Sequence, residues 1–419
     1  MRFEELAAGD RWAFAIGPFG SRVTTGDYRE SGVPFVRGVN LARGPFLDDD
    51  FVYIDEGKAR EIGFAAVTAG DLVFTRKGTI GQVSMIPRAP RFVRYVISGS
   101  QMKARLDETR ACPEFYYYWF RSPVGRQRLL ANAGAVGVPS LPNSLATLRD
   151  LRVPLPPLPV QRAIAEVLGT LDGKIAVNER IAATYERMLR LEFAALGIDV
   201  PPAPGAAVPA SALVDFNPRR RLPRTPDAAY VGMADLPTAT ARVTAWTRRP
   251  PKPGTRFTNG DTVMARITPC LENGKTAYID FLDADEVGAG STEFIVMRAR
   301  PPYPPQLSYF LARSPRFRGH AVRSMAGSSG RQRVAAAALA GFPLARPDAG
   351  RLAAFGAAAS AAFAHVKALD AESGALAELR DALLPKLTSG AIPVRAAAPA
   401  VTGDRRDVTH VTSPPAAPA

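Results

Sequence analysis

The strongest constraint on this chain is an internal duplication. The stretch AGDLVFTRKGTIGQVSMIP at residues 69–87 has a counterpart, NGDTVMARITPCLENGKTAYI, at residues 259–279. Each stretch opens with Gly-Asp and runs through a β-rich segment to an arginine, Arg76 in the first and Arg266 in the second. Each then reaches a glycine-containing loop and a second apolar run. The two stretches predict the same strand–loop–strand unit twice.

The correspondence continues downstream. YYYWFRSPVGRQRLL at residues 116–130 matches SYFLARSPRFRGHAV at residues 308–322, and each places aromatic residues before an Arg-Ser-Pro step and arginines after it. A Gly/Ser-containing loop follows in both halves, at 134–140 in the first and at 327–330 in the second. A Pro-Leu step then follows each loop, at 154–155 and at 343–344. The offset stays between 189 and 193 positions. Chance does not hold an offset over so many features, so the chain consists of two copies of one plan.

Each copy ends in a predicted long helix. The first begins near Gln161, after a proline-rich stretch at 153–159 that we expect to be extended rather than helical, and stops before Gly197. Its stripe comprises Ile164, Leu168, Leu171, Ile175, Ala182, Tyr185 and Leu189, with Asn178 as a polar register residue. The second is predicted from about Ala349 to Ser389, loosened at Gly374 and Pro385. Its stripe comprises Leu352, Phe355, Phe363, Val366, Leu369, Leu376, Leu379, Leu383 and Leu387. Two such helices, one closing each half, are most simply explained by packing on each other.

The remaining segments indicate a mixed α/β fold (α+β). Short β-runs are predicted at 33–39, 72–75, 82–86 and 294–297, and the aromatics of 115–120 are assigned to a core. The expected divisions are a first domain at 1–152, a first helix with its proline-rich lead-in at 153–198, a linker at 199–210, a second domain at 211–345, a second helix at 346–392 and a disordered tail at 393–419.

Charge and composition narrow the function. The formal net charge is +14, mostly from arginine, which favours an anionic partner, although a GC-rich genome would inflate arginine too. Two cysteines and three histidines have no metal-site spacing. The acidic, polar N-terminus predicts no signal peptide, and the apolar runs are too weakly hydrophobic for a membrane span, so a cytoplasmic location is expected.

Catalytic motifs are missing from the sequence. It contains no Gly-x-x-x-x-Gly-Lys-Ser/Thr phosphate loop and no Asp/Asn-Pro-Pro-Tyr/Phe methylation motif, since Asn217-Pro218 is followed by Arg219. We therefore expect no catalytic residues and no cofactor in this chain. Two alternatives stay open: a self-contained nuclease or methyltransferase, and a free-standing DNA-binding regulator.

Several segments resemble the specificity subunit of Type I restriction-modification systems. They are GPFGSRVTTGDYRESGVPFVRGVNL at 17–41, TRKGTIGQVSMIP at 75–87, VPLPPLPVQRAIAEVLGTLDGKI at 153–175, MARITPCLENGKTAYI at 264–279 and LRDALLPKLTSG at 379–390. The second half departs from the pattern, because FPLARPDAGR replaces the proline-rich lead-in and an alanine-rich helix follows.

The resemblance implies a pseudo-two-fold protein in which two target-recognition domains are separated by two long antiparallel coiled-coil helices. Such a protein reads a bipartite double-stranded DNA target and is not itself an enzyme. The helices dock two methyltransferase subunits, and motor-nuclease subunits join them. S-adenosylmethionine, ATP and Mg²⁺ are then expected only in those partners, which carry adenine-N6 methylation and ATP-dependent cleavage.

The candidate DNA-binding residues are cations of the glycine loops and of the Arg-Ser-Pro steps, together with one loop serine. They are Arg22, Arg37, Arg76, Lys77, Arg121, Arg126, Arg128, Ser140, Arg266, Lys275, Arg313, Arg316, Arg318, Arg323 and Arg331. Phosphate contact is the modest expectation for most of them, because such contacts position a protein without reading bases. A solvated loop or helix face is the alternative for each.

Overall fold

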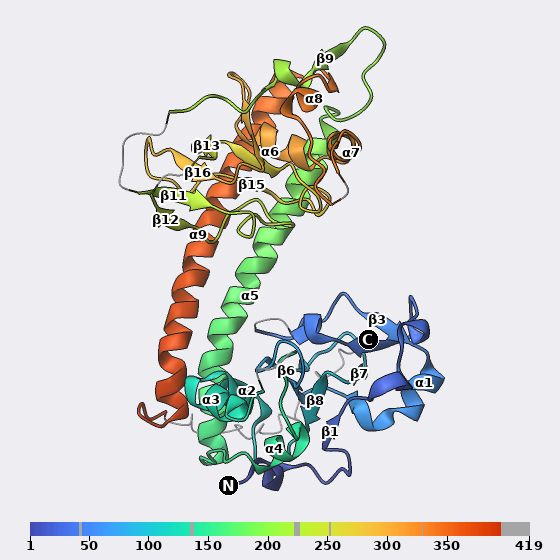
Figure 1. The fold of residues 1–419 in the computed structure, drawn as a ribbon. Coiled ribbons are helices and arrows are strands. Elements are labelled where there is room, and N and C mark those ends of the chain that lie inside the picture. Colours follow the sequence, from blue (N-terminus) through green and yellow to red (C-terminus); the bar gives the residue numbers. More distant parts are fainter. Residues whose placement is uncertain (42–43, 135–137, 222–226, 251–252, 329, 395–419) are drawn as a thin grey trace, which may run out of the picture. The chain divides into compact units, whose positions relative to one another are not determined.

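The computed structural model of the 419-residue chain describes residues 1–394 except 42–43, 135–137, 222–226, 251–252 and 329. It divides into two compact units. Unit 1 comprises residues 1–173 together with the chain from 377 onward, and unit 2 comprises residues 174–376. Both units mix strands and helices, as the sequence predicts (Figure 1).

Unit 1 contains two four-stranded sheets, with strand orders β1-β8-β5-β6 and β3-β2-β7-β4. The strands are β1 Phe14–Ile16, β2 Val33–Val36, β3 Val52–Ile54, β4 Ala66–Val67, β5 Leu72–Thr75, β6 Val83–Met85, β7 Tyr95–Ile97 and β8 Gln101–Ala104. All pairings are antiparallel except β2 with β7. Successive side chains of a strand point to opposite faces, so β5 sends Leu72 and Phe74 into one core and Val73 into another.

The helices of unit 1 are α1 Glu56–Glu61, α2 Pro113–Arg121, α3 Pro123–Leu130 and α4 Ser144–Asp150. Every residue of 115–120 on α2 is buried, which confirms their assignment to the core. The Arg-Ser-Pro step is a helix boundary. Ser122 is extended and its hydroxyl accepts the backbone N–H of Gly125, while Pro123 starts α3, where a missing N–H costs nothing.

Unit 2 repeats this topology, with strand orders β10-β17-β14-β15 and β12-β11-β16-β13 and a single parallel pair, β11 with β16. Its strands are β9 Ala207–Pro209, β10 Val214–Phe216, β11 Ala228–Val231, β12 Thr247–Arg249, β13 Thr255–Phe257, β14 Thr262–Ala265, β15 Thr276–Tyr278, β16 Gly288–Gly290, β17 Phe294–Ala299 and β18 Pro343–Ala345. Its shorter helices are α6 Gln306–Arg313, α7 Pro315–Arg323 and α8 Ala336–Ala340. The predicted duplication is confirmed in the two four-stranded sheets of each unit, while the pair β9–β18 is an addition in unit 2.

The repeated Gly-Asp pair has a structural cause. In unit 1 the Asp71 carboxylate is 1% exposed and accepts hydrogen bonds from Arg105 Nε at 2.8 Å and from the Thr68 backbone N–H at 2.9 Å. In unit 2 Asp261 is fully buried and does the same with Arg298 Nε at 2.6 Å and the Thr258 N–H at 2.8 Å. The preceding glycine has a positive φ in both units, 84° and 90°, which only glycine adopts without strain.

The two long helices are α5 Leu158–Ala195 and α9 Ala349–Thr388. In the core of unit 1, Ile164 and Leu168 of α5 cluster with Leu384 and Leu387 of α9. In unit 2, Leu189 and Phe193 cluster with Leu352 and Phe355, and Figure 1 shows the helices side by side there. Residue numbers rise along α5 as they fall along α9, so the helices pack antiparallel within each unit.

Asn178 occupies the apolar stripe of α5 and is 1% exposed, as the register prediction requires. Its Nδ2 donates to Glu372 Oε2 at 2.8 Å and to Ser373 Oγ at 3.2 Å on α9. The hydrogen bond from Asn178 to Glu372, together with one from Lys174, holds the pKa of Glu372 below its usual value. A buried amide with partners at one level of the partner helix favours one alignment of the pair over a shifted one.

Some boundaries differ from the sequence prediction. Helix α5 begins at Leu158, inside the proline-rich stretch, because Pro159 falls in the first turn, where its missing N–H has no helical acceptor. Helix α9 continues without a break past Gly374 and Pro385. Leu379 is 48% exposed, and its expected place is taken by Arg380, which binds Asp172 on α5 at 2.6 Å.

Two further segments complete the comparison. The predicted linker at 199–210 contains β9, which pairs with β18 and so belongs to a sheet. Residues 395–419 of the predicted tail lie outside the described residues.

By length and composition α9 could cross a membrane, and it is the one helix among the described residues that meets this test. The sequence analysis expected no such segment. The same stretch places Leu352, Phe355 and Phe363 in the core of unit 2, which accounts for its apolar character.

Candidate nucleic-acid interface

In unit 1 the predicted basic loop after β5 is joined by backbone hydrogen bonds to two neighbouring loops. The Arg76 N–H donates to Ser100 O at 2.9 Å, the Gly78 N–H to Pro139 O at 2.9 Å, and the Leu141 N–H to Arg76 O at 2.9 Å. We call residues 76–81, 98–101 and 138–141 loop cluster 1. Because these loops share hydrogen bonds, they form one continuous piece of surface.

Unit 2 builds the same arrangement after β14. The Arg266 N–H donates to Glu293 O at 3.0 Å, the Thr268 N–H to Gln332 O at 3.1 Å, and the Val334 N–H to Arg266 O at 3.0 Å. We call residues 266–274, 291–293 and 330–334 loop cluster 2. The duplication therefore extends to the basic loops, and each unit carries one cluster in the corresponding place.

Arg76 is half-buried, and its guanidinium group forms hydrogen bonds within the protein. Its Nε donates to Ser144 Oγ at 2.8 Å and its Nη1 donates to Gly99 O at 2.9 Å. The guanidinium carbon also lies 5.1 Å from the ring centre of Phe19. Burial lowers the pKa of Arg76 from its usual value. The adjacent Lys77 is exposed, and no described residue pairs with its ammonium group.

The counterpart Arg266 lies beside an ion pair that the sequence analysis did not identify. Arg333 donates to Glu293 through Nε at 2.8 Å and through Nη2 at 2.7 Å. Arg333, followed by Arg266, holds the pKa of Glu293 below its usual value. The Nε of Arg266 is buried and has no hydrogen-bond partner among the described residues. The pair fixes the 330–334 loop against Glu293, the residue before β17, and the only signal for it was an arginine at the end of a predicted loop.

Six of the predicted contact residues are exposed and pair with no carboxylate in the described part of the chain. They are Arg22, Lys77, Arg126, Arg128, Arg323 and Arg331. Two of these bind backbone carbonyls: Arg126 donates to Gly81 O at 3.1 Å, and Arg128 donates to Arg152 O. The Ser140 backbone pairs with both Gly134 and Lys77 and so belongs to loop cluster 1. Residues 135–137 and 329 of the two predicted Gly/Ser loops lie outside the described residues.

The other predicted cations bind groups inside their own unit. Arg313 is the clearest case, because its side chain is 8% exposed and donates to Thr238 O at 2.6 Å and Gly274 O at 3.3 Å. Burial lowers its pKa from the usual value. The remaining partners are the Tyr117 hydroxyl and Asp172 for Arg121, Val200 O and Pro343 O for Arg316, Glu272 O for Arg318, Met233 O for Lys275 and Asp50 O for Arg37. These contacts hold loops and helices in place, and the DNA contact expected of these residues stays a prediction.

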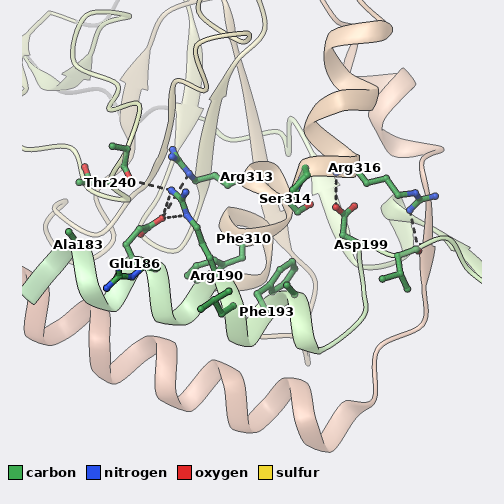
Figure 2. Close-up of a pocket in the computed structure, with 16 residues that line it drawn as sticks. Ala183, Glu186, Arg190, Phe193, Asp199, Thr240, Phe310, Arg313, Ser314 and Arg316 are labelled. Carbon is green, nitrogen blue, oxygen red and sulfur yellow. Dashed lines mark hydrogen bonds and ion pairs between the residues drawn. The ribbon is translucent and has the colours of Figure 1, made fainter. Parts of the chain in front are cut away.

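Figure 2 shows a pocket of about 740 Å³ in unit 2, lined by α5 on one side and by α6 and the start of α7 on the other. Glu186 and Arg313 lie 3.9 Å apart at one end, and Arg190 donates to Glu186 there at 2.9 Å. Asp199 accepts the backbone N–H of Arg316 at 2.8 Å at the other end. Between these ends the lining is largely apolar, which suits an apolar surface of another molecule better than DNA.

A basic run escaped the sequence analysis. Arg219, Arg220 and Arg221 are all exposed and follow β10, the counterpart of β1. Asn217, which lies just before this run, has a φ of 52°. Its side-chain Oδ1 accepts a hydrogen bond from the Val296 N–H at 2.9 Å. The signal was present as three consecutive arginines after Asn217-Pro218. No cluster of three or more potential metal ligands occurs among the described residues.

The fold of the chain has a counterpart among solved structures. The chain is similar to a solved S subunit of a Type I restriction-modification system from M. genitalium, with a TM-score of 0.54 and 13% sequence identity over 92% of this chain and 95% of that one. At this identity the likeness concerns the fold alone. It supports the reading of the two units with their antiparallel helices as one known architecture.

The sequence comparisons point to the same kind of protein over part of the chain. Residues 22–187 match the family described as Type I restriction modification DNA specificity domain. Two curated relatives from Escherichia coli are the EcoAI specificity subunit, 39% identical over 84 residues, and the EcoEI specificity subunit, 35% identical over 97 residues. The aligned stretches cover 19% and 22% of this chain and only 14% and 16% of those proteins. Residues 22–187 are therefore similar to the Type I restriction modification DNA specificity domain, and the resemblance drawn from the sequence is confirmed.

Proposed function

We propose that this chain is a specificity subunit that recognises a bipartite double-stranded DNA target. One observation carries the proposal: loop clusters 1 and 2 have the same hydrogen-bonded construction, and each presents exposed cations, Lys77 in the first and Arg331 in the second. A net charge of +14 favours a polyanion as the partner of these surfaces. Two similar basic clusters on one chain suit two half-sites of one target.

The proposed recognition domains are residues 1–152 and 211–345, joined by α5 and α9. The proposed contact set is the group of six exposed cations given above, to which we add Arg219–Arg221. Phosphate contact is the proposed role for these residues, because contacts of exposed cations with phosphates position a protein on the duplex without reading base edges. Arg76 and Arg266 are proposed to position the clusters.

The chain is proposed to act without a catalytic site or cofactor of its own. Methyltransferase and motor-nuclease subunits would supply catalysis, and S-adenosylmethionine, ATP and Mg²⁺ would bind to them. The part of α5 in unit 2 offers a surface for such partners, since Val177, Met188 and Leu191 are 37%, 41% and 68% exposed on it. Exposed apolar side chains on one helix favour burial against another protein. A location with the host DNA, in the cytoplasm, follows from this role.

Replacement of Lys77 or Arg331 by alanine is expected to weaken DNA binding equally for all sequences. Each exposed cation that neutralises one phosphate contributes about 0.9 to the slope of log K against log salt. We therefore expect each variant to lower that slope by about one. Fluorescence anisotropy with one duplex at several salt concentrations measures it.

The control for this experiment is Arg60→Ala on α1, since Arg60 is 74% exposed and lies 3.8 Å from Glu56. This variant removes the same charge away from loop cluster 1 and should leave the slope unchanged. Equal slopes for Lys77→Ala, Arg331→Ala and the wild type would contradict the placement of DNA on the loop clusters.

A further inference from the structure

The loop that follows β1 presents a large apolar side chain to solvent beside loop cluster 1. Phe19 is 58% exposed, while the other phenylalanines of unit 1 belong to its hydrophobic cores or pack against them. The loop is fastened at the two residues that precede Phe19. A side chain on Gly17 would overlap the carbonyl oxygen of Ser98, and one on Gly99 would overlap the carbonyl oxygen of Pro18. The backbone of this loop therefore lies tightly against residues 98–99, and the aromatic ring is held outward.

The ring is also fixed from one side. The Arg76 guanidinium carbon lies 5.1 Å from the Phe19 ring centre, and the guanidinium is itself held by hydrogen bonds to Ser144 and Gly99. Such a cation–π contact is favourable and limits the rotation of the ring. Arg76 is thus a positioning residue for Phe19, and Lys77 next to it carries the exposed charge.

We propose that Phe19 contacts a thymine methyl group in the first half-site, and so helps to determine specificity. This inference rests on the proposed function. The thymine C5-methyl group is the apolar feature that a base pair presents in the major groove, and phenylalanine is among the side chains that contact it. An apolar wedge in the minor groove would have to enter between base pairs. A ring with one face covered by a fixed guanidinium suits an edge or face contact with a methyl group instead.

The test removes the methyl group from the DNA and the ring from the protein. The full chain, purified with whatever subunits accompany it, is first used to select its target from random duplexes. Each thymine of the selected target is then replaced by uracil, which lacks only the methyl group. At one position of one half-site we expect uracil to weaken binding of the wild type roughly fourfold, the effect of one buried methyl group. Phe19→Ala should abolish that difference, and Phe19→Leu should retain part of it.

Arg76→Ala should reduce the same thymine preference, and the double variant Phe19→Ala/Arg76→Ala should show no smaller preference than Phe19→Ala alone. Val93→Ala is the control, because Val93 is 92% exposed elsewhere in unit 1 and its loss should change nothing. The inference is overturned if no thymine of the selected target depends on Phe19, or if Phe19→Ala weakens thymine and uracil duplexes alike. Failure of the wild type to select any sequence would instead overturn the proposed function.

Discussion

Replacement of Asp261 by alanine is expected to lower the free energy of unfolding of unit 2 by about 3–5 kcal/mol, the cost of removing one partner from a buried ion pair. Asp261 is fully buried, and its loss leaves the 21% exposed Arg298 without its carboxylate and the Thr258 N–H without an acceptor. Asp71→Ala should do the same in unit 1, because Arg105 and Thr68 have the same roles there. Hydrogen exchange should show lost protection in β14 and β17 for the first variant and in β5 and β8 for the second.

The control is Asp283→Ala, since Asp283 is 84% exposed and pairs with Arg248 at 3.3 Å on the surface. Exposed pairs of this kind contribute about 0–1 kcal/mol. If Asp261→Ala and Asp283→Ala destabilise the chain to the same small extent, the Gly-Asp turns are not the structural centre of the repeat.

Replacement of Leu191 by glutamate is expected to remove the methyltransferase subunits that we propose as partners from the purified complex. Leu191 is 68% exposed on α5 and lines the same apolar pocket as Phe193 and Phe310 (Figure 2). A carboxylate there would be buried without a partner in any interface that covers the pocket. At the centre of such an interface we expect a loss of affinity of roughly 30-fold or more, a cost of about 2 kcal/mol. Co-purification with a tagged chain measures it.

Val93→Glu serves as the matched control, because it adds the same charge at a 92% exposed apolar position in unit 1. Unchanged co-purification with Leu191→Glu, in a chain whose circular dichroism matches the wild type, would show that this face of α5 does not bind the partner.

The fold could be predicted largely from the sequence because the same series of local signals occurs in both halves of the chain. The Gly-Asp turns and the Arg-Ser-Pro steps are local signals, and each has a local cause: a buried carboxylate beside a positive-φ glycine, and a serine that caps the next helix. The helical stripes likewise follow from spacing alone. The start of α5 is predicted too late, because the proline-rich stretch favours an extended chain. A proline is nevertheless tolerated in the first turn of a helix, and Pro159 occupies that turn.

The candidate site was less accessible from the sequence. In the sequence Arg121 and Arg313 resemble surface cations that follow an aromatic run. In the structure Arg121 lies against Asp172, and Arg313 lies against Glu186, which is more than a hundred positions away in the sequence. Such partners come together only through the tertiary fold. Phe19 shows the converse, since nothing in its sequence context distinguishes an exposed aromatic from a core residue. Leu379 was predicted as part of the stripe and is exposed, because Arg380 reaches Asp172 in its place.

The central claim is that two similar units on one chain read two separate half-sites. The most direct measurement is the DNA sequence selected by the full chain with its accompanying subunits, compared with that selected after residues 1–152 are exchanged for the first recognition domain of another specificity subunit. The account predicts a target of two specific half-sites around a spacer of fixed length, in which the exchange changes one half-site and leaves the other intact. Selection of one continuous sequence, or a change in both half-sites, would contradict it.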